Sequence, residues 1–330
     1  MKFMKELILK TMLLLAVAMT FANCDSNGGD GDSNNLEVTG SAQFEITDAP
    51  IDDTNIQGTF VTVTAVKVDG EVISDFSGSQ TIDLLAYQNG ETKLLGMGEL
   101  ETGTYSNVSL VLDHETDASG NTPGCYVMTT DNKKHKLESS ASAVSEITIN
   151  NNEFTVEENS TTNIVMDFDV RKAIKKQDNA TDDDKYDFVT EAELRSSIRV
   201  VKKDRSGKVK GSANDMLGFA GDRIVVYAYK KGTFNESVET QGQGSSNIMF
   251  KNATSSAVVN ANGEYNLSFL EEGEYELHYV GYEDDNNDGA MEAKGMLEVT
   301  ALTSLDLLGF QIDAAADISV NVTVIGIIPF

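Results

Sequence analysis

The chain has 330 residues and a formal net charge of −28 at pH 7, because Asp and Glu outnumber Lys and Arg by 53 to 25. Such a charge repels nucleic acid, whose binding depends on Lys and Arg at the phosphates, and it disfavours anionic lipid headgroups. The composition therefore excludes nucleic acid as an expected partner. It favours an acidic, well solvated surface that suits divalent cations or basic partners.

The first 23 residues have the pattern of a secretion signal. Lys2, Lys5 and Lys10 form a basic start, and the largely apolar run Met12–Ala22 follows them. As a helix this run is about 16 Å long at about 1.5 Å per residue, whereas a bilayer core is about 30 Å thick. The run is too short to span a membrane, so we expect residues 1–23 to be a signal peptide.

Cys24 ends this leader. The sequence Phe21-Ala22-Asn23-Cys24 resembles a lipobox, in which small residues precede the cysteine that receives the lipid. The resemblance implies that Cys24 is lipidated and that the mature protein is held on a membrane by acyl chains, since two chains give the stable attachment that one does not. The alternative is an ordinary cleaved signal in which Cys24 has no role.

Residues 24–35 are predicted to be the lipidated cysteine and a disordered tether. Positions 25–35 contain no apolar residue that could offset the entropy of ordering. An acidic stretch directly after the cysteine also resembles the export signal of lipoproteins displayed on the outer face of the outer membrane. That resemblance implies a surface-exposed outer-membrane lipoprotein of a Gram-negative bacterium. A plain spacer that faces the periplasm is the alternative.

Period-two patterning then predicts strands. Within 36–46, Ala42, Phe44 and Ile46 share one parity and polar residues share the other, which is typical of a half-buried strand. Asp69-Gly70 predicts a hairpin between the strand at 60–68 and the next residues. Further strands are expected at 80–85, 105–112, 125–130, 145–149, 153–157, 162–168 and 198–201, short helices at 171–176 and 190–195, and a polar loop at 177–187.

Residues 41–201 resemble the family known as domain of unknown function 4382 (DUF4382). The residues that carry the resemblance are Thr47-Asp48-Ala49-Pro50, the Val/Thr strand at 60–68, Ile82-Asp83-Leu84-Leu85, Gly103-Thr104-Tyr105, Val108-Ser109-Leu110, Met166-Asp167-Phe168-Asp169 and Ile198-Arg199-Val200. The resemblance implies a β-sandwich and no assigned activity.

A basic, polar stretch near 202–207 predicts a boundary between a first domain at 36–203 and a second at 204–330. In the second domain, strands are expected at 222–230, 256–260, 264–269, 274–282, 295–300 and 318–326, with a hairpin turn at Asn262-Gly263. Many short strands with regular turn signals predict an all-β fold of two tandem β-sandwiches.

Residues 205–327 resemble the carboxypeptidase-regulatory-like, transthyretin-type β-sandwiches. The residues that carry the resemblance are Gly207-Lys208-Val209, Val225–Tyr229, Gly263–Leu267 and Leu270–Leu277. The resemblance implies a module that acts as a spacer or a binding platform rather than a catalyst.

The sequence Asp284-Asp285-Asn286-Asn287-Asp288-Gly289 fits the first half of an oxygen-ligand calcium loop. Asp284, Asn286 and Asp288 alternate so that their side chains can converge on one ion, and Glu292 is a candidate late ligand. Position 12 of the loop is Gly295 instead of Glu, and no helices are expected around it. An acidic hairpin turn, for which Asp, Asn and Gly are well suited, is the alternative.

Other chemical groups are predicted to be structural. Asp48 is expected to cap a turn before Pro50, and Cys125 to be a small buried strand residue. Cys125 is the only cysteine besides Cys24, so no internal disulfide is expected once Cys24 carries a lipid. His278 is expected to be exposed, and no histidine stands at metal-ligand spacing to another.

The sequence contains no nucleophile elbow, phosphate loop or zinc signature, so we expect no enzyme. The predicted function is that of a membrane-anchored cell-envelope lipoprotein with a non-catalytic binding or scaffold role for a protein or glycan partner. No cofactor is expected other than the calcium ion of the 284–289 loop. The alternative is a glycan-processing or other hydrolytic enzyme that uses carboxylates, with Asp48 as the residue to test.

Overall fold

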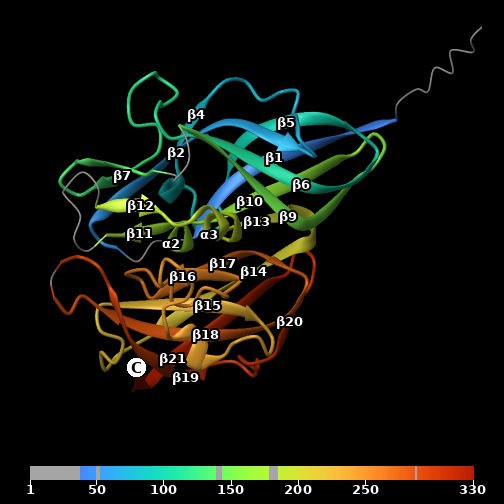
Figure 1. The fold of residues 1–330 in the computed structure, drawn as a ribbon. Coiled ribbons are helices and arrows are strands. Elements are labelled where there is room, and N and C mark those ends of the chain that lie inside the picture. Colours follow the sequence, from blue (N-terminus) through green and yellow to red (C-terminus); the bar gives the residue numbers. More distant parts are fainter. Residues whose placement is uncertain (1–37, 50–52, 139–142, 178–184, 287) are drawn as a thin grey trace, which may run out of the picture. The chain divides into compact units, whose positions relative to one another are not determined.

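The computed structural model describes residues 38–49, 53–138, 143–177, 185–286 and 288–330 (Figure 1). The predicted signal peptide, Cys24 and the tether lie outside the described residues. Of the residues that the structure describes, 57% are in strands and 7% in helices, which confirms the predicted all-β class. Residues 38–330 form one compact unit.

Residues 38–202, here called the N-terminal sandwich, contain two main sheets. In the first, β1 (Thr39–Ala49) lies between the parallel strand β10 (Thr161–Asp169) and the antiparallel strand β5 (Lys93–Glu101). The other strand of this sheet is β13 (Ile198–Lys202), which pairs with β10. The second sheet has the order β8 (Lys134–Lys136), β7 (Tyr126–Thr129), β2 (Ile56–Val68), β6 (Gly103–Asp113) and β9 (Val144–Val156), with β3 (Glu71–Val72) and β4 (Gln80–Asp83) also paired to β2.

The alternation in the sequence places one hydrophobic core between these two sheets. Phe44 and Ile46 of β1 and Val61 and Val63 of β2 are fully buried in the same cluster. Phe44 also meets Phe154 of β9 edge to face, with 6.2 Å between the ring centroids. Side chains that alternate along each strand therefore bury one face of each sheet against the other.

Small elements complete the N-terminal sandwich. They are η1 (Leu84–Ala86), α2 (Val170–Ala173), β11 (Ile174–Lys176), β12 (Tyr186–Phe188) and α3 (Glu191–Ser196). The predicted helix at 171–176 is shorter than expected, because its second half is strand β11 paired with β12. The predicted strands at 145–149 and 153–157 are one continuous strand, β9.

Residues 206–330, here called the C-terminal sheet, follow the single turn η3 (Lys203–Arg205). Their strands run in the order β16 (Ser255–Val258), β15 (Arg223–Lys230), β18 (Gly273–Glu283), β19 (Glu292–Ala301), β21 (Asp317–Pro329), β14 (Ser206–Asn214) and β17 (Glu264–Glu271). The edge strand β20 (Phe310–Ile312) pairs with β18, and α4 (Glu236–Glu239) is the one α-helix among the described residues of this part.

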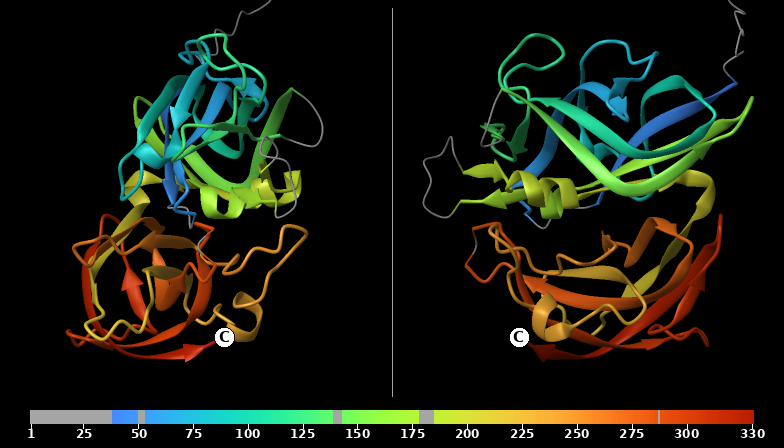
Figure 2. Two further views of the ribbon diagram at one scale, coloured as in Figure 1. Left: turned by 90° about the vertical axis from the view of Figure 1, so that its left-hand side faces the viewer. Right: turned by 45° about the vertical axis from the view of Figure 1, so that its right-hand side comes forward.

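This sheet curls round its own core (Figure 2). Its two end strands, β16 and β17, lie in contact with each other although they are the first and the last of seven strands in the hydrogen-bonded order. Tyr265, Tyr275 and Tyr279 are buried inside, and the hydroxyl groups of Tyr265 and Tyr279 are hydrogen-bonded at 2.9 Å. Both faces of the predicted second sandwich are therefore parts of one continuous sheet.

Glycines explain why β5 is absent from the sequence-based prediction. Gly96 and Gly98 face Ile73, and a Cβ at Gly98 would lie 2.9 Å from the Ile73 Cβ atom. The close approach requires glycine at two positions where a core strand would normally show large apolar residues. The apolar alternation on which the prediction depends is therefore missing from this strand.

The two parts of the compact unit touch along β1. Glu45, Thr47 and Asp48 of this strand are buried, although their parity predicts exposure for Glu45 and Thr47. Strand β16 of the C-terminal sheet contacts β1, and the Glu45 carboxylate accepts a hydrogen bond of 2.5 Å from the ammonium of Lys203 in the connecting turn η3. This covered end of β1 is where the polar chemistry of the molecule concentrates.

Candidate functional site

The predicted calcium loop joins β18 to β19 and is closed by its own hydrogen bonds. The Asp284 carboxylate accepts the backbone N–H groups of Asp288 (3.0 Å) and Gly289 (2.9 Å). The Asn286 Oδ1 atom accepts the Asp288 N–H at 2.8 Å, and Gly289 has the positive φ of 86° that a tight turn requires. These bonds are those of an Asx-type turn.

The same loop also contacts the N-terminal sandwich. The Lys176 ammonium lies 2.7 Å from the Asp288 carboxylate, and the Asn55 side-chain amide donates to the Asp288 carbonyl at 2.6 Å. The Thr54 N–H donates to the Gly289 carbonyl at 2.9 Å. Lys176, together with the Ala290 N–H, lowers the pKa of Asp288. The loop therefore acts as a contact between the two parts of the molecule.

Three of the four predicted calcium ligands lie in this loop, and the fourth, Glu292, is the first residue of β19. The Glu292 carboxylate accepts long hydrogen bonds from the Asp285 N–H (3.3 Å) and from the Asn286 amide (3.4 Å). Among the residues that the structure describes, no group of three His, Cys, Asp or Glu side chains is placed to hold a metal ion. Calcium at Asp284, Asn286, Asp288 and Glu292 stays a prediction.

Asp48 occupies a different place from the one expected. Its carboxylate accepts the Val170 backbone N–H at 3.1 Å and the Gln88 side-chain amide at 3.3 Å, and it is buried. Burial raises the pKa of Asp48 well above its ordinary value, and the neighbouring carboxylates of Asp169 and Asp167 raise it further. The predicted turn cap is thus a buried carboxyl group at the contact between the two parts.

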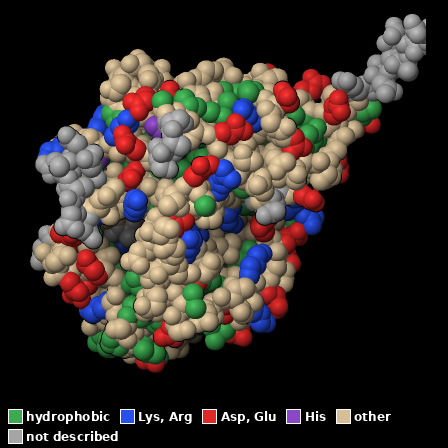
Figure 3. All heavy atoms as spheres, in the orientation of Figure 1, with side chains coloured by type: hydrophobic (Ala, Val, Ile, Leu, Met, Phe, Trp, Pro, Cys, Tyr) green, Lys and Arg blue, Asp and Glu red, His purple; other side chains and the backbone are tan. Residues whose placement is uncertain are grey.

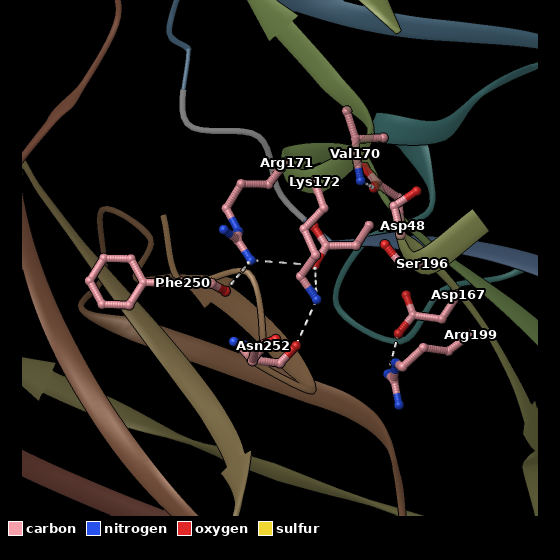
Figure 4. A network of polar contacts seen from close by, with 12 residues as sticks. Asp48, Asp167, Val170, Arg171, Lys172, Ser196, Arg199, Phe250 and Asn252 are labelled. Carbon is pink, nitrogen blue, oxygen red and sulfur yellow. Dashed lines mark hydrogen bonds and ion pairs between the residues drawn. The ribbon is translucent and has the colours of Figure 1, made fainter. Parts of the chain in front are cut away.

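Asp48 belongs to a cluster that we call the buried junction (Figure 4). Its charged members are Asp48, Asp167, Asp169, Arg171, Lys172 and Arg199, which come from β1, β10, α2 and β13. The parallel register of β1 and β10 pairs Asp48 with Phe168, so that Asp167 and Asp169 flank the residue opposite Asp48.

Cations of the buried junction cross to the C-terminal sheet. The Arg171 guanidinium donates to the carbonyl groups of Met249 (2.8 Å) and Phe250 (3.2 Å), and the Lys172 ammonium donates to the Ala253 carbonyl at 2.6 Å. Lys172 also lies 3.0 Å from the Asp169 carboxylate.

Two carboxylates of the junction are paired with cations. Burial opposes ionisation of Asp169, but Lys172 and Arg171 outweigh it and lower its pKa. Asp167 is ion-paired with Arg199, whose guanidinium also reaches the Phe269 carbonyl at 3.4 Å. Asp167 and Asp169 therefore each have a cationic partner, as low-dielectric surroundings demand of a buried charge, whereas Asp48 is held by the Val170 N–H and the Gln88 amide.

Glu193 of α3 makes a second contact between the parts. Its carboxylate accepts the Thr190 hydroxyl (2.8 Å) within a capping box, and across the contact it accepts the Ser246 hydroxyl (2.6 Å) and N–H (3.2 Å). Burial opposes ionisation of Glu193, yet the hydrogen bonds from Ser246 and Thr190 prevail and lower its pKa to about 2. The group holds the 240–251 segment against α3.

Neither the cysteine nor the histidines form a reactive centre among the described residues. Cys125 is fully buried, as predicted, and burial raises the pKa of its thiol to about 12, so no thiolate forms at neutral pH. The expectation that His278 is exposed is wrong. Its ring stacks on Phe234 at 3.7 Å between centroids, because the 231–235 loop folds over that face of β18.

Several hollows lie near the buried junction. One of about 650 Å³ is on the outer face of the C-terminal sheet and is lined mainly by Asn and Ser side chains together with Lys210 and Glu264. A second hollow of about 380 Å³ lies on the other side of Asn89 and Asn266. The third, between Asp48 and Asp167 on one side and Ser256 on the other, is only about 20 Å³, which is room for about one water molecule.

Charges of both signs mix over the surface (Figure 3). On the face shown, acidic side chains lie among basic ones and are not gathered in one patch. Among the described residues, the model contains no helix with the length and apolar character needed to cross a bilayer.

Sequence reasoning missed Arg171, Lys172 and Glu193, because no motif marks them and their partners are distant in the chain. The polar residues that line the large hollow alternate along β14, β17 and β21, and this alternation is visible in the sequence. The pairing of these strands, which brings the polar residues together, cannot be predicted from it.

Comparison with solved structures gives only remote similarity. The matches include a leucine-rich repeat protein from Bacteroides thetaiotaomicron VPI-5482 (12% identity, 88% of this chain and 26% of that chain, TM-score 0.22). They also include BcpA, the major pilin subunit of Bacillus cereus (9% identity, 87% and 70%, TM-score 0.20), and GBS52, the minor pilin of Streptococcus agalactiae (15% identity, 88% and 97%, TM-score 0.18). The chain spans about a quarter of the Bacteroides protein. Such low TM-scores support no argument about fold or function.

No curated protein matches the chain. A family model does match part of it, over β1 to β12 and the approach to α3. The match confirms the resemblance noted for the first half of the sequence, and the description of the family assigns no activity. Residues 39–190 match the model of the family described as Domain of unknown function (DUF4382).

Proposed function

We propose that the protein is a membrane-anchored cell-envelope lipoprotein whose folded body binds or holds a partner without catalysis. The anchor rests on the basic and apolar leader, on Cys24, and on the apolar-free stretch at 25–35. The acidic residues in that stretch support display on the cell surface, with the periplasmic face as the alternative. The second part of the chain, with its resemblance to transthyretin-type modules, serves as a binding platform.

The size of the cavity at Asp48 carries the non-catalytic half of the proposal. A hydrolase needs its carboxylates at a pocket that admits substrate, and ligand pockets are typically about 300–1,000 Å³. Asp48 and Asp167 instead border a cavity of about 20 Å³. The other carboxylates of the junction and Glu193 are held by Lys172, Arg199 and Ser246. These groups join the two parts of the protein.

Replacement of Cys24 tests the anchor. We expect Cys24→Ser to move the protein from the membrane fraction to the soluble fraction of the envelope, because the acyl chains are its attachment. Cys125→Ala is the matched control and should stay with the membrane. A Cys24→Ser protein that remained membrane-bound and normally processed would refute the anchor. Protease shaving of intact cells then distinguishes the two faces, since only a surface protein is cut.

Catalysis is tested on the soluble Cys24→Ser chain. We expect no hydrolysis of glycan or ester substrates above that of an Asp48→Ala variant. A robust activity that Asp48→Ala abolishes would overturn the non-catalytic proposal and leave the anchor untouched.

A further inference from the structure

The hollow of about 650 Å³, here called the polar groove, is built by the register of three neighbouring strands. Lys210 of β14 is paired with Asn266 of β17 on one side and with Ser319 of β21 on the other. Two residues further along, Ser212 is paired in the same way with Glu264 and Asn321. Side chains at the same parity lie on one face, and neighbouring strands are about 4.8 Å apart. The outer face therefore presents two rows of three polar side chains.

The chemistry of these rows favours a neutral ligand with many hydroxyl groups. Asn and Ser side chains both donate and accept hydrogen bonds, as hydroxyl groups do. The charge of Lys210 is matched by Asp317 at 2.8 Å, and Glu264 is the only acidic side chain that lines the groove. In a chain of net charge −28, a hollow with so little net charge is poorly suited to an ion.

Two amides are oriented with their donors unused by the protein. The Asn321 Oδ1 atom accepts both the Ser212 N–H and the Ser212 hydroxyl at 3.0 Å. The Asn260 Oδ1 atom accepts the N–H groups of Asn262 (2.8 Å) and Glu264 (3.0 Å). Because each oxygen is taken, the amide orientation is fixed. Within the described part of the chain neither NH₂ group has a hydrogen-bond acceptor, so each offers two donors to a ligand.

The polar groove adjoins a second hollow, so a ligand longer than one small ring can be accommodated. The Asn266 amide donates to the Asn89 carbonyl at 2.6 Å, and this contact separates the polar groove from the neighbouring hollow of about 380 Å³. Asn89 and Asn266 line both. An elongated ligand could lie over this contact and occupy both hollows.

We infer that the polar groove binds a neutral oligosaccharide. The inference deepens the proposed function, because it names the partner class of the binding platform. An extended peptide is a different partner, and it would be expected to pair its backbone with a strand edge rather than to use side-chain amides in two rows.

The test uses the soluble Cys24→Ser chain and neutral oligosaccharides of glucose, xylose, mannose and galactose, with binding measured by isothermal titration calorimetry. Ser319 is exposed and lines the groove, so Ser319→Tyr should fill it and weaken binding at least about tenfold, which equals about 1.4 kcal/mol. The matched control is Ser304→Tyr, at an exposed position outside the groove, and it should bind as the parent does.

A second pair of variants removes a donor without adding bulk. Asn260→Ala should weaken binding severalfold through the lost hydrogen bonds, whereas Asn262→Ala, an exposed neighbour that does not line the groove, should not. The melting temperatures of the variants show that each one is folded.

Three results would overturn the inference. They are no binding of any oligosaccharide, binding that Ser319→Tyr leaves unchanged, and binding of an unstructured peptide alone that Ser319→Tyr abolishes. If the protein fractionates as an anchored lipoprotein but gives any of these results, the proposed function stands and only the inference about the polar groove is refuted.

Discussion

The buried junction and the polar groove both gather polar side chains where the N-terminal sandwich meets the C-terminal sheet, and they differ in access to water. In the junction, Lys172 is almost fully buried and lies 3.0 Å from Asp169. In the groove, Lys210 is half-exposed and meets Asp317 at 2.8 Å. Removing one partner of the buried pair lowers the unfolding free energy strongly, whereas the exposed pair contributes little to stability. The comparison separates residues that hold the fold from residues that are free to bind.

The largest effect is expected from Asp169→Asn. The change leaves Lys172 and Arg171 buried without their carboxylate, and loss of one partner of a buried pair costs about 3–5 kcal/mol of unfolding free energy. Urea unfolding of the soluble chain measures it. The double variant Asp169→Asn with Lys172→Met should recover part of the loss, because it removes the unpaired charge as well. An equal loss in Asp317→Asn, the exposed counterpart, would erase the distinction between the two regions.

Asp48→Asn should raise the unfolding free energy, in contrast to Asp169→Asn, and the size of the gain should depend on pH. The pKa of Asp48 is raised in the folded state, so the folded protein resists ionisation of this carboxyl group more than the unfolded chain does. This difference has no effect on stability at or below the unfolded pKa of about 3.9. Above that pH it lowers the unfolding free energy, and more so as the pH rises. An amide removes this cost and can still accept the Val170 N–H. We expect Asp48→Asn to stabilise the protein by about 1–2 kcal/mol at pH 7 and to have little effect at pH 4.

The measurement for Asp48 is the difference in urea midpoint between variant and parent across that pH range. Asp169→Asn, made in parallel, should show the reverse trend. The pKa of Asp169 is lowered, so its contribution is present above the unfolded pKa and is lost as the pH falls through the folded one. A destabilised Asp48→Asn at pH 7 would contradict the raised pKa.

The smallest effect concerns calcium at the 284–289 loop. Calcium would have to replace the backbone N–H groups that Asp284 and Asn286 now accept, so we expect weak binding in the millimolar range of extracellular modules. Millimolar calcium should stabilise the soluble chain by about 1 kcal/mol or less, and a chelator should reverse it. Asp284→Asn should abolish the shift, while Asp306→Asn, in another surface turn, should not. If calcium does not change the urea midpoint, the loop is a turn and a contact between the two parts, and it binds no calcium.

The sequence predicts most of the fold, because period-two alternation directly reports burial on one face. It is correct for β1, where Phe44 and Ile46 enter the core, and it fails at β5, where Gly96 and Gly98 replace the large apolar residues. Glu45 shows a further limit. Its parity predicts exposure, but it is buried, and its carboxylate accepts a hydrogen bond from Lys203, which is 158 positions away.

The candidate sites are less accessible to sequence reasoning. Alternation identifies Ser212 and Asn321 as polar and outward-facing, but only the parallel pairing of β14 with β21 makes them neighbours. Likewise, nothing local distinguishes Lys172 from a solvated lysine, since its partner carbonyl at Ala253 is 81 positions away. The Asp284–Gly289 motif, in contrast, is local and was visible, yet its contacts with Asn55 and Lys176 were not.

The position of β1 has a mechanical consequence for a protein held by its N-terminal segment. A force transmitted through that segment pulls β1 along its length. Both edges of β1 are bonded, to β10 over Ser41–Ala49 and to β5 over Thr39–Ile46. Ladder hydrogen bonds run across the strands, so the pull loads many of them together in shear instead of opening them one by one. The strand next to the proposed anchor is thus the one best placed to resist being torn out when the bound partner moves.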